Sequence, residues 1–448
     1  MDPAQASTRA APVGAHPDLS VVMLTKNESE NVASLVPRLW DVIRRLGIDA
    51  EILVVDGSTD DTLEVARRLG CRVLRQERAG YGAALDQGLG AAVGEYVATI
   101  DADYSHEPEF LYQMWAARTS ADVVIGSRYV RAGSAEMPLV RRILSRILNH
   151  VFAAVLALPY RDLSSGFRLY HSRVLRSAAH LAGRDFDAQQ ELIVRAYCDG
   201  WRIREVPIRY RPRHAGRSNA RALRFALSYL RTLRTLWALR NSASSCDYDS
   251  RAFDSWILPQ RWWQRRRFRM ITDLVRGEAH SVDVGCGASQ IVQALPAMTG
   301  LDVNLRKLRF LRRKDASQSL VCGSAFALPF RTGAFSTLVS SEVIEHVPKA
   351  RVLIAEMNRV LEAGGTLVLG TPDYSSRAWR VIEWFYGRLM PTGYEEEHIS
   401  HYTGEELRAL LPSIGFVIRS EHTIAASERI FHAEKVRDAW REPPTVSP

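Results

Sequence analysis

The stretch EYVATIDAD, residues 95–103, ends an apolar, strand-like run with two carboxylates, Asp101 and Asp103. In an extended segment, the side chains of residues i and i+2 point to the same side. Open α/β sheets bind their ligands beyond the carboxyl ends of the strands. Two oxygen ligands on one side suit Mg²⁺ or Mn²⁺ bridging a diphosphate. An isolated D-x-D sequence is more commonly a solvated acidic turn, so the rest of the chain has to decide between the two interpretations.

Strand-like and helix-like segments alternate on both sides of this stretch. The predicted strands of the first half are residues 19–24, 51–55, 73–74, 95–100 and 121–126. A polar, Ser-rich segment at 242–254 is interpreted as a linker. The predicted strands after it are residues 281–285, 300–303, 320–322, 336–341 and 365–371. This alternation predicts an α/β protein with two doubly wound domains, each a parallel sheet with helices on both faces.

Length and composition narrow the class of protein. A chain of 448 residues with 46% hydrophobic and 24% charged residues is typical of two or three soluble globular domains. No apolar run of 18 residues occurs, so no transmembrane helix is expected. Residues 1–18 lack the apolar core of a secretory signal and are expected to be a disordered leader. Five scattered cysteines favour a reducing cytoplasm over a disulfide framework or structural zinc site.

The net charge of +9 is unevenly distributed. Residues 1–240 hold 33 cationic and 26 anionic side chains, whereas residues 241–448 hold 26 and 24. Residues 201–240 contain 11 Arg and one acid, Glu205. Such a basic block suggests an anionic partner, which is a phosphate, a membrane surface or nucleic acid. Genome base composition is the other explanation for the general excess of Arg over Lys.

Five further segments accompany the D-x-D pair in the first half. They are VVMLTKNESENV (21–32), ILVVDGSTDDT (52–62), VVIGSRY (123–129), SSGFRLY (164–170) and REVPIRYRPRHAGRS (204–218). Together, over residues 19–235, they resemble the family 2 glycosyltransferases of the GT-A fold. Within that family the set looks most like the dolichol-phosphate mannosyltransferase and polyprenyl-phosphate glycosyltransferase branch.

The resemblance implies a role for several residues. Asp56 matches the acid that contacts the base and ribose of a nucleotide-diphospho-sugar, and Asp101 and Asp103 match the pair that holds metal and diphosphate. The implied catalytic residues are Asp103, Arg128 and Arg213. The implied acceptor-binding residues are Arg141, Ser145, Gln190 and Glu191. The chain departs from the branch at Ser105, where a Gln is common, and at Asn219, where a Lys is usual.

The chemistry favours a phosphate as the acceptor. A phosphate is already ionised at pH 7, so catalysis needs positioning and charge neutralisation more than a general base. A hydroxyl acceptor would require a carboxylate base. Neither a T-E-D-type motif nor the Q-x-x-R-W motif of processive enzymes occurs in the chain. Both absences favour a single transfer to a phosphate. The resemblance implies an inverting transfer to polyprenyl phosphate or a similar acceptor, in the synthesis of a cell-envelope glycan or glycolipid.

Two apolar helical patterns and one histidine have alternative interpretations. The segments 138–158 and 221–240 each present a broad apolar face with several Arg residues. Such helices either pack against their own domain or lie on anionic lipid at the inner face of the plasma membrane. His106 is either a ligand of the D-x-D site or a residue of the local turn.

The second half carries a different set of motifs. It contains SVDVGCGAS (281–289), GLDVN (300–304), CGSAFALPF (322–330), FSTLVSSEVIEHV (335–347) and NRVLEAGGTLVLGTPD (358–373). Glycines after a strand allow close approach of a ligand to the backbone. Over residues 265–430 the set resembles class I S-adenosylmethionine-dependent methyltransferases of the type 11 pattern.

This resemblance also implies particular residues. The implied cofactor-binding residues are Asp283, Gly285, Gly287, Asp302, Ser324 and Ala325, with Asp302 on the ribose and Ser324 and Ala325 beside the adenine. Glu342 and His346 border the substrate side, where His346 is either a general base or a structural residue. Ser289 replaces the third glycine of the loop, and Ser324 replaces the usual Asp. The preceding segment Arg261–Arg267 either caps the cofactor cleft or grips nucleic acid or lipid.

The sequence thus predicts a leader (1–18), a glycosyltransferase domain (19–241), a linker and cap (242–264), a methyltransferase domain (265–435) and a tail (436–448). The predicted protein is a bifunctional enzyme that uses Mg²⁺ or Mn²⁺ and S-adenosylmethionine. One alternative is a glycosyltransferase with a non-catalytic methyltransferase-like scaffold. Another is a nucleic-acid-directed methyltransferase with a degenerate first domain. The intact D-x-D and Arg set opposes this last alternative, so nucleic acid is not expected as a partner.

Overall fold

The computed structural model describes residues 16–177, 187–211, 222–275, 277, 280–348, 350–389 and 398–439. The chain forms two compact units, the first of residues 1–197 and 201–237 and the second of residues 198–200 and 238–448. The predicted leader and tail lie mostly outside the described residues, and Arg213 and Asn219 lie wholly outside them. The domain boundaries given by the sequence stay predictions.

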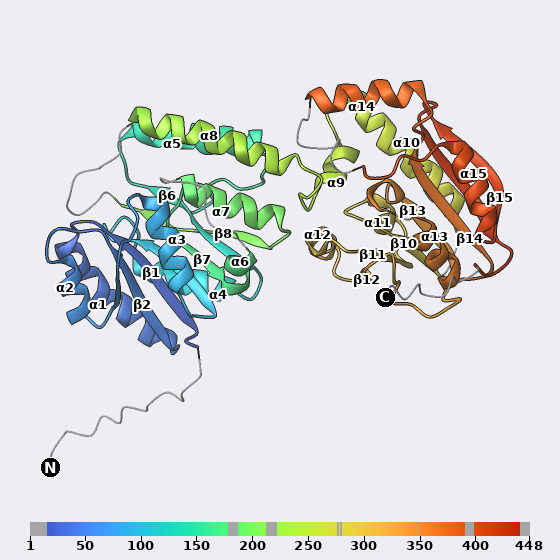
Figure 1. Ribbon diagram of the computed structural model, residues 1–448. Coiled ribbons are helices and arrows are strands. Elements are labelled where there is room, and N and C mark those ends of the chain that lie inside the picture. Colours follow the sequence, from blue (N-terminus) through green and yellow to red (C-terminus); the bar gives the residue numbers. More distant parts are fainter. Residues whose placement is uncertain are drawn as a thin grey trace, which may run out of the picture. The chain divides into compact units, whose positions relative to one another are not determined.

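The first unit is built on a seven-stranded sheet with the order β3-β2-β1-β4-β7-β5-β8 (Figure 1). Its strands are β1 (Leu19–Thr25), β2 (Ala50–Asp56), β3 (Arg72–Arg75), β4 (Tyr96–Asp101), β5 (Val123–Ser127), β7 (Arg168–His171) and β8 (Ile203–Pro207). All neighbouring strands pair in parallel except β7, which is antiparallel to both β4 and β5. The short strands β6 (Ser134–Ala135) and β9 (Arg209–Tyr210) form a separate parallel pair.

Helices cover both faces of this sheet. Helices α1 (Ser29–Leu46) and α4 (Leu111–Ala117) bury apolar side chains against one face, and α3 (Tyr81–Ala91) and α6 (Ser172–Ser177) pack on the other. In α1 the buried residues recur three and four positions apart, which places them on one side of the helix. The remaining helices are α2 (Thr62–Arg68), η1 (Pro108–Phe110), α5 (Leu139–Val155), α7 (Asp187–Cys198) and α8 (Ala222–Arg240).

Helices α5 and α8 lie side by side (Figure 1). The hydroxyl of Tyr229 on α8 donates to the carbonyl of Leu148 on α5 at 3.2 Å, and the Tyr229 and Phe152 rings are 5.0 Å apart. The two helical segments at 138–158 and 221–240 are therefore confirmed as helices that pack on each other within the first unit.

The second unit has its own seven-stranded sheet, with the order β12-β11-β10-β13-β14-β16-β15 (Figure 1). Its strands are β10 (Ser281–Val284), β11 (Met298–Asp302), β12 (Leu320–Cys322), β13 (Phe335–Ser341), β14 (Leu361–Pro372), β15 (Phe416–Ile424) and β16 (Glu428–Lys435). The strands from β12 to β14 pair in parallel, whereas β16 is antiparallel to both β14 and β15.

Two layers of helices enclose this second sheet. Helices α13 (Ala350–Val360) and α15 (Gly404–Ser413) pack on one face, and α10 (Leu258–Val275), α11 (Gln290–Ala294) and α12 (Leu305–Lys314) pack on the other. The unit also contains α9 (Tyr248–Phe253), η2 (Ile344–His346) and α14 (Arg377–Leu389). Among the residues that the model describes, no helix combines the length and the apolar character needed to cross a bilayer.

The predicted fold class is confirmed, with two differences of detail. Both sheets are mixed rather than purely parallel, because β7 and β16 run against their neighbours. The segment interpreted as a polar linker contains α9, and α10 begins within the predicted cap. The polar composition of 242–254 hid α9 because that helix has only six residues and buries just Ser250 and Ala252.

Candidate active sites

The pairing of β1 with its two neighbours brings the first acids together. In the ladders of the sheet, Thr25 lies opposite Asp56 and Leu24 lies opposite Asp101. Parallel strands end at the same edge of a sheet, so Asp56 and Asp101 flank the carboxyl end of β1. This is the edge at which open α/β sheets bind ligands.

Asp56 is fully buried, and only one of its two carboxylate oxygens has hydrogen-bond partners. Its Oδ1 accepts hydrogen bonds from Thr25 Oγ1 at 2.7 Å and from Ser58 Oγ at 2.5 Å. Its Oδ2 has no hydrogen-bond partner, and Arg75 Nη1 lies 4.0 Å away. A buried carboxylate oxygen without a partner is costly. The carboxylate is therefore suited to accept from a ligand donor.

The two carboxylates of the D-x-D stretch differ in exposure. The Asp101 side chain is 34% exposed at the end of β4, and Asp103 is 6% exposed. The next residue, Tyr104, has a φ of 61°, a left-handed conformation that is costly for a non-glycine residue and that recurs at functional sites. A Cβ on Gly166 would lie 2.7 Å from Asp101 Oδ2, so a larger residue there would displace this carboxylate from its place. The hard oxygen donors fit Mg²⁺ or Mn²⁺.

His106 lies directly behind the acids. Its ring is 1% exposed, its Nδ1 is 3.6 Å from Asp101 Oδ2, and its centre is 5.6 Å from the Phe167 and Tyr210 rings. Burial, together with the positive charge of Arg128, lowers the pKa of His106 to about 4. The imidazole is therefore neutral at pH 7 and packs as a buried support of the site.

Arg128 is held by a buried carboxylate. Its Nε and Nη2 donate to the two oxygens of Asp162 at 2.7 and 2.6 Å, and Nη2 also donates to Ser164 Oγ at 2.7 Å. Burial alone would raise the pKa of Asp162, but the Arg128 charge outweighs it and lowers that pKa. Burial works against the cation of Arg128, but Asp162 raises the pKa of the guanidinium. Both groups are ionised at pH 7, and the pair is a fixed structural unit.

A chain of hydrogen bonds connects this pair with Ser145 on α5. Asn149 Nδ2 donates to Ser164 Oγ and to the carbonyl of Ser145, each at 2.9 Å. The Tyr129 hydroxyl donates to Ser145 Oγ at 2.7 Å. The structure thus brings the predicted acceptor residue Ser145 next to the loop that holds Arg128.

Tyr210 on β9 is the point where the predicted site residues meet. Burial raises its pKa, the negative charges of Asp103 and Asp101 raise it further, and the positive charges of Arg141 and Arg128 oppose them. The Arg128 Cζ is 5.5 Å from the centre of the Tyr210 ring. Sequence reasoning missed Tyr210, although it lies in the quoted segment 204–218. A two-residue strand gives no periodic signal.

Gln190 and Glu191 are buried on α7. Glu191 Oε1 accepts from Arg195 Nε at 2.7 Å within the helix. Gln190 Oε1 has no hydrogen-bond partner. Their predicted contact with an acceptor stays a prediction.

In the second unit, a glycine turn follows β10. Gly285 and Gly287 have φ angles of 78° and 53°, and a Cβ on Gly285 would lie 2.3 Å from Val343 Cγ2. Asp283 Oδ2 is buried without a hydrogen-bond partner. Burial, with the nearby Asp302 charge, raises the pKa of Asp283 to about 7. A tight glycine cradle beside an unpartnered buried carboxyl fits the cationic amino-acid part of S-adenosylmethionine.

Two carboxylates accept hydrogen bonds from backbone amides of this turn. Asp302 accepts from the amides of Gly287 at 2.7 Å and Asn304 at 2.6 Å. Asp249 on α9 accepts from the amide of Ala288 at 2.8 Å. Sequence reasoning missed Asp249 because it lay in the predicted linker.

The predicted adenine-side residues follow β12, which pairs with β11. Cys322 lies opposite Asp302 in that ladder, so Ser324 and Ala325 come just beyond the same strand ends. Ser324 is exposed, and its hydroxyl accepts from the amide of Phe326 at 3.2 Å.

Helix α10 contacts Glu342, which the sequence predicts to border the substrate side. Arg267 Nη2 is 3.2 Å from Glu342 Oε2, and Arg267 Nε donates to Glu428 Oε1 at 2.5 Å. Trp263 Nε1 also donates to Glu428, at 2.5 Å. Glu342 has a φ of 59°, and burial raises its pKa well above the ordinary value. These contacts support the interpretation of Arg261–Arg267 as part of a cap.

Comparisons with known proteins agree with this geometry. The model of the family "Glycosyl transferase family 2" matches residues 20–178, and the model named "Methyltransferase domain" matches residues 282–369. A dolichyl-phosphate hexose transferase of Haloferax volcanii is 34% identical over 197 residues, which are 44% of this chain and 84% of that protein. The chain is a family 2 glycosyltransferase with a methyltransferase domain.

Other similarities of this glycosyltransferase lie in the same region. An uncharacterized glycosyltransferase of Mycobacterium bovis is 33% identical over 205 residues, covering 45% of this chain and 88% of that protein. Among solved structures, glucosyl-3-phosphoglycerate synthase of Mycobacterium tuberculosis aligns with 22% identity and a TM-score of 0.40, covering 50% of this chain and 80% of that chain.

The buried Arg128–Asp162 pair leads to a prediction about the stability of this glycosyltransferase. Replacement of Asp162 by Ala leaves the guanidinium buried without its counter-charge and is expected to cost about 3–5 kcal/mol of unfolding free energy, measured by urea unfolding. The double variant Arg128→Met, Asp162→Leu is expected to recover most of that loss. Glu109→Ala, which breaks the exposed pair with Arg38, is the matched control and should cost less than about 1 kcal/mol. Equal losses for Asp162→Ala and the control would contradict the assignment.

Proposed function

We propose that the first unit transfers a sugar from a nucleotide-diphospho-sugar to polyprenyl phosphate or a similar phosphate acceptor, with the help of Mg²⁺ or Mn²⁺. The observation that carries the proposal is the arrangement of groups around Tyr210. Asp101 Oδ2 lies 3.6 Å from His106 Nδ1, the centre of the His106 ring is 5.6 Å from that of Tyr210, and the Arg128 Cζ is 5.5 Å from the Tyr210 ring centre. The charges of Asp103 and Arg141 also act on the pKa of Tyr210. Such a site combines two carboxylates that can hold a cation with Arg141, whose charge can hold an anion, while Asp162 and Ser164 fix Arg128 beside them. The name of the Haloferax volcanii relative supports a polyprenyl-type acceptor.

The residues have distinct roles in this proposal. Asp56 accepts from the base or ribose through its unpartnered Oδ2. Asp101 and Asp103 would hold the divalent ion, which neutralises charge on the departing diphosphate. An oxygen of the acceptor phosphate attacks the anomeric carbon, the bond from that carbon to the diphosphate breaks, and the nucleoside diphosphate leaves. The acceptor is already ionised, so neutral His106 is not needed as a base.

This proposal is tested by substitution of Asp103. Asp103→Asn keeps the size of the side chain but removes a metal-binding charge, so we expect at least a 100-fold loss of transfer. The assay is mass spectrometry of the products from a panel of nucleotide sugars with polyprenyl phosphate. Asp41→Asn, an exposed acid on α1, is the control and should transfer normally. Normal transfer by Asp103→Asn would refute the metal assignment.

We also propose that α5 binds the surface of an anionic membrane from the cytoplasmic side. Seven apolar side chains of α5 are 44–79% exposed; they are Leu139, Val140, Ile143, Leu144, Ile147, Val151 and Val155. At 100° per residue they occupy one continuous side of the helix, with Arg142 and Arg146 on one flank and Arg141 on the other. Helix α5 contains no acid. None of the five cysteines, all of which are among the described residues, forms a disulfide bond, which fits a reducing compartment.

Flotation with vesicles of anionic phospholipid tests the membrane proposal. The double variant Ile143→Gln, Ile147→Gln removes apolar area from the exposed side of α5 and is expected to reduce vesicle binding at least 10-fold. Val93→Gln changes an apolar residue that is 43% exposed outside α5 and is the matched control. Absence of wild-type flotation, or equal flotation of both variants, would overturn the proposal.

For the second unit we propose transfer of a methyl group from S-adenosylmethionine to the glycan product or to a neighbouring compound of the same pathway. The glycine turn and the unpartnered Oδ2 of Asp283 support binding of this cofactor. The predicted ribose and adenine residues lie at the same edge of the sheet, beyond the carboxyl ends of β11 and β12; they are Asp302, Ser324 and Ala325. The alternative, a purely structural domain, does not require an unpartnered acid at the turn.

Calorimetric titration with S-adenosylmethionine separates these alternatives. In the free protein, Asp283 with a pKa of about 7 is largely protonated at pH 6. A cation bound beside it favours the ionised form, so binding at pH 6 should release close to one proton, and fewer at pH 8. Titrations in buffers of different ionisation enthalpy measure this release, and Asp283→Asn should abolish it. No heat of binding for the wild type would favour the structural domain.

A further inference from the structure

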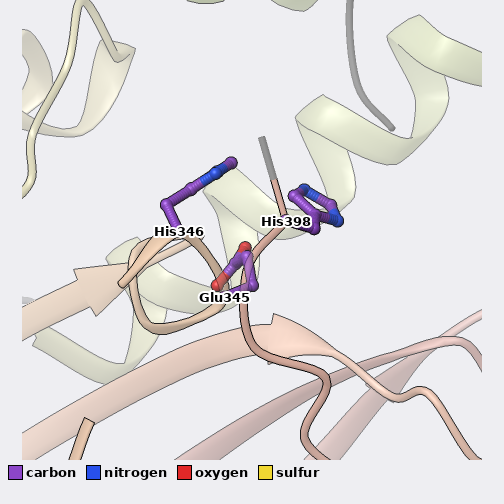
Figure 2. A group of neighbouring side chains, drawn as sticks. All are labelled: Glu345, His346 and His398. Atoms are coloured by element: carbon purple, nitrogen blue, oxygen red, sulfur yellow. The ribbon is translucent and has the colours of Figure 1, made fainter. Parts of the chain in front are cut away.

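Three side chains with metal-binding atoms converge in the second unit (Figure 2). Glu345 and His346 are neighbours on η2, and His398 comes from the segment that leads into α15. One ligand atom from each residue lies within 4.8 Å of those of the other two. We propose that Glu345, His346 and His398 bind one divalent transition-metal ion on the substrate side of the methyltransferase domain.

Backbone hydrogen bonds fix the His398 segment against η2. The amides of Ile399 and Ser400 both donate to the carbonyl of Glu345, at 2.8 and 2.9 Å. The hydroxyl of Ser400 donates to the carbonyl of Val347 at 2.7 Å. The ligands are therefore brought together by a defined local structure, although 52 positions separate His398 from His346 in the sequence.

Glu345 gives an independent reason to expect a cation. Its side chain is fully buried, its Oε2 accepts from Thr371 Oγ1 at 3.1 Å, and its Oε1 has no hydrogen-bond partner. Figure 2 shows the Glu345 side chain beside the two imidazoles. A buried carboxylate oxygen that lacks a donor is costly unless a proton or a metal ion occupies its place.

The two imidazoles lie close together, and the ring of His398 has an outer partner. Their ring centres are 4.8 Å apart at an interplanar angle of 67°. Nδ1 of His398 contacts the hydroxyl of Tyr374, an outer partner of the kind that fixes the ring orientation of a ligating histidine. This contact makes Nε2 the ligand atom of His398.

The donor set selects the class of ion. Two imidazoles and one carboxylate suit Zn²⁺, Co²⁺, Fe²⁺ or Mn²⁺ rather than Ca²⁺, which takes only oxygen ligands. Three protein ligands leave coordination positions for water or substrate, as in catalytic zinc sites.

The cluster is close in sequence to the glycine turn. Val343 precedes Glu345 by two residues, and its side chain packs against Gly285 of that turn. The ion would therefore receive an oxygen of the methyl acceptor, an inference that rests on the proposed methyl transfer. We infer an acceptor with a hydroxyl group, since a metal ion favours its ionised form.

Metal binding is tested first with the full chain carrying Asp101→Asn and Asp103→Asn, which removes the other predicted metal site. After chelation and dialysis, titration with Co²⁺ alone should give one bound ion per chain and a visible ligand-field absorption that Zn²⁺ displaces. No saturable absorption, or no displacement by Zn²⁺, would overturn the proposal.

Substitutions in the same background identify the ligands. Glu345→Gln and His398→Asn should each weaken Co²⁺ binding at least 100-fold, and Tyr374→Phe should weaken it about 10-fold through the outer partner. His422→Asn on β15 is the control, because it removes a histidine elsewhere in the same unit. Unchanged affinity in folded Glu345→Gln or His398→Asn would overturn the ligand assignment. Should both unfold, Tyr374→Phe with unchanged affinity would overturn it.

A second titration separates this inference from the proposed methyl transfer. S-adenosylmethionine is titrated into the metal-free and the Zn²⁺-loaded chain. Cofactor binding without a specific metal site would overturn the metal inference alone. A specific metal site in a chain that does not bind S-adenosylmethionine would refute the methyl transfer and the hydroxyl acceptor but would support the ion site.

Discussion

The parallel pairing of central strands is the constraint on which both candidate sites depend. Strand β1 fixes the ends of β2 and β4, and so it fixes the separation of Asp56 and Asp101 across one edge. In the second unit, β10 does the same for β11 and β13, which carry Asp302 and lead to Glu342. The apolar cores hold these strands in register. This register brings the polar residues at the carboxyl ends of the strands close together.

Antiparallel β7 brings the loop that precedes it to the edge of the sheet where the parallel strands end. Because it runs in the opposite direction, its start lies where β4 and β5 end. The loop that enters β7 therefore carries Asp162, Ser164 and Gly166 to the same edge as the D-x-D acids. The counter-charge of Arg128 and the close approach to Asp101 both follow from this one reversed strand.

The sequence could predict the candidate residues that lie at a strong local signal, and their roles stay predictions. Asp56 and Asp101 end β2 and β4, Asp283 lies within the apolar strand β10, and the glycine turn directly follows β10. The residues that were missed come from weak or distant elements. Tyr210 belongs to a strand of two residues, Asp162 precedes a strand of four, and His398 joins η2 only through long-range backbone hydrogen bonds. No local pattern encodes such pairings, because their partners are set by tertiary packing.

The position of β7 between β4 and β5 also has a consequence for the order of events during synthesis. Strand β4 is complete at Asp101 and can pair with β1, but β7, its partner on the other side, begins only at Arg168. At about 5–20 residues per second, the ribosome needs about 3–13 s to supply that partner. During this interval the β4 edge of the nascent sheet has unpaired amides and carbonyls, which is a risk for aggregation. A strand inserted late into the sheet thus lengthens the time for which the nascent chain has an open edge in the middle of its future sheet.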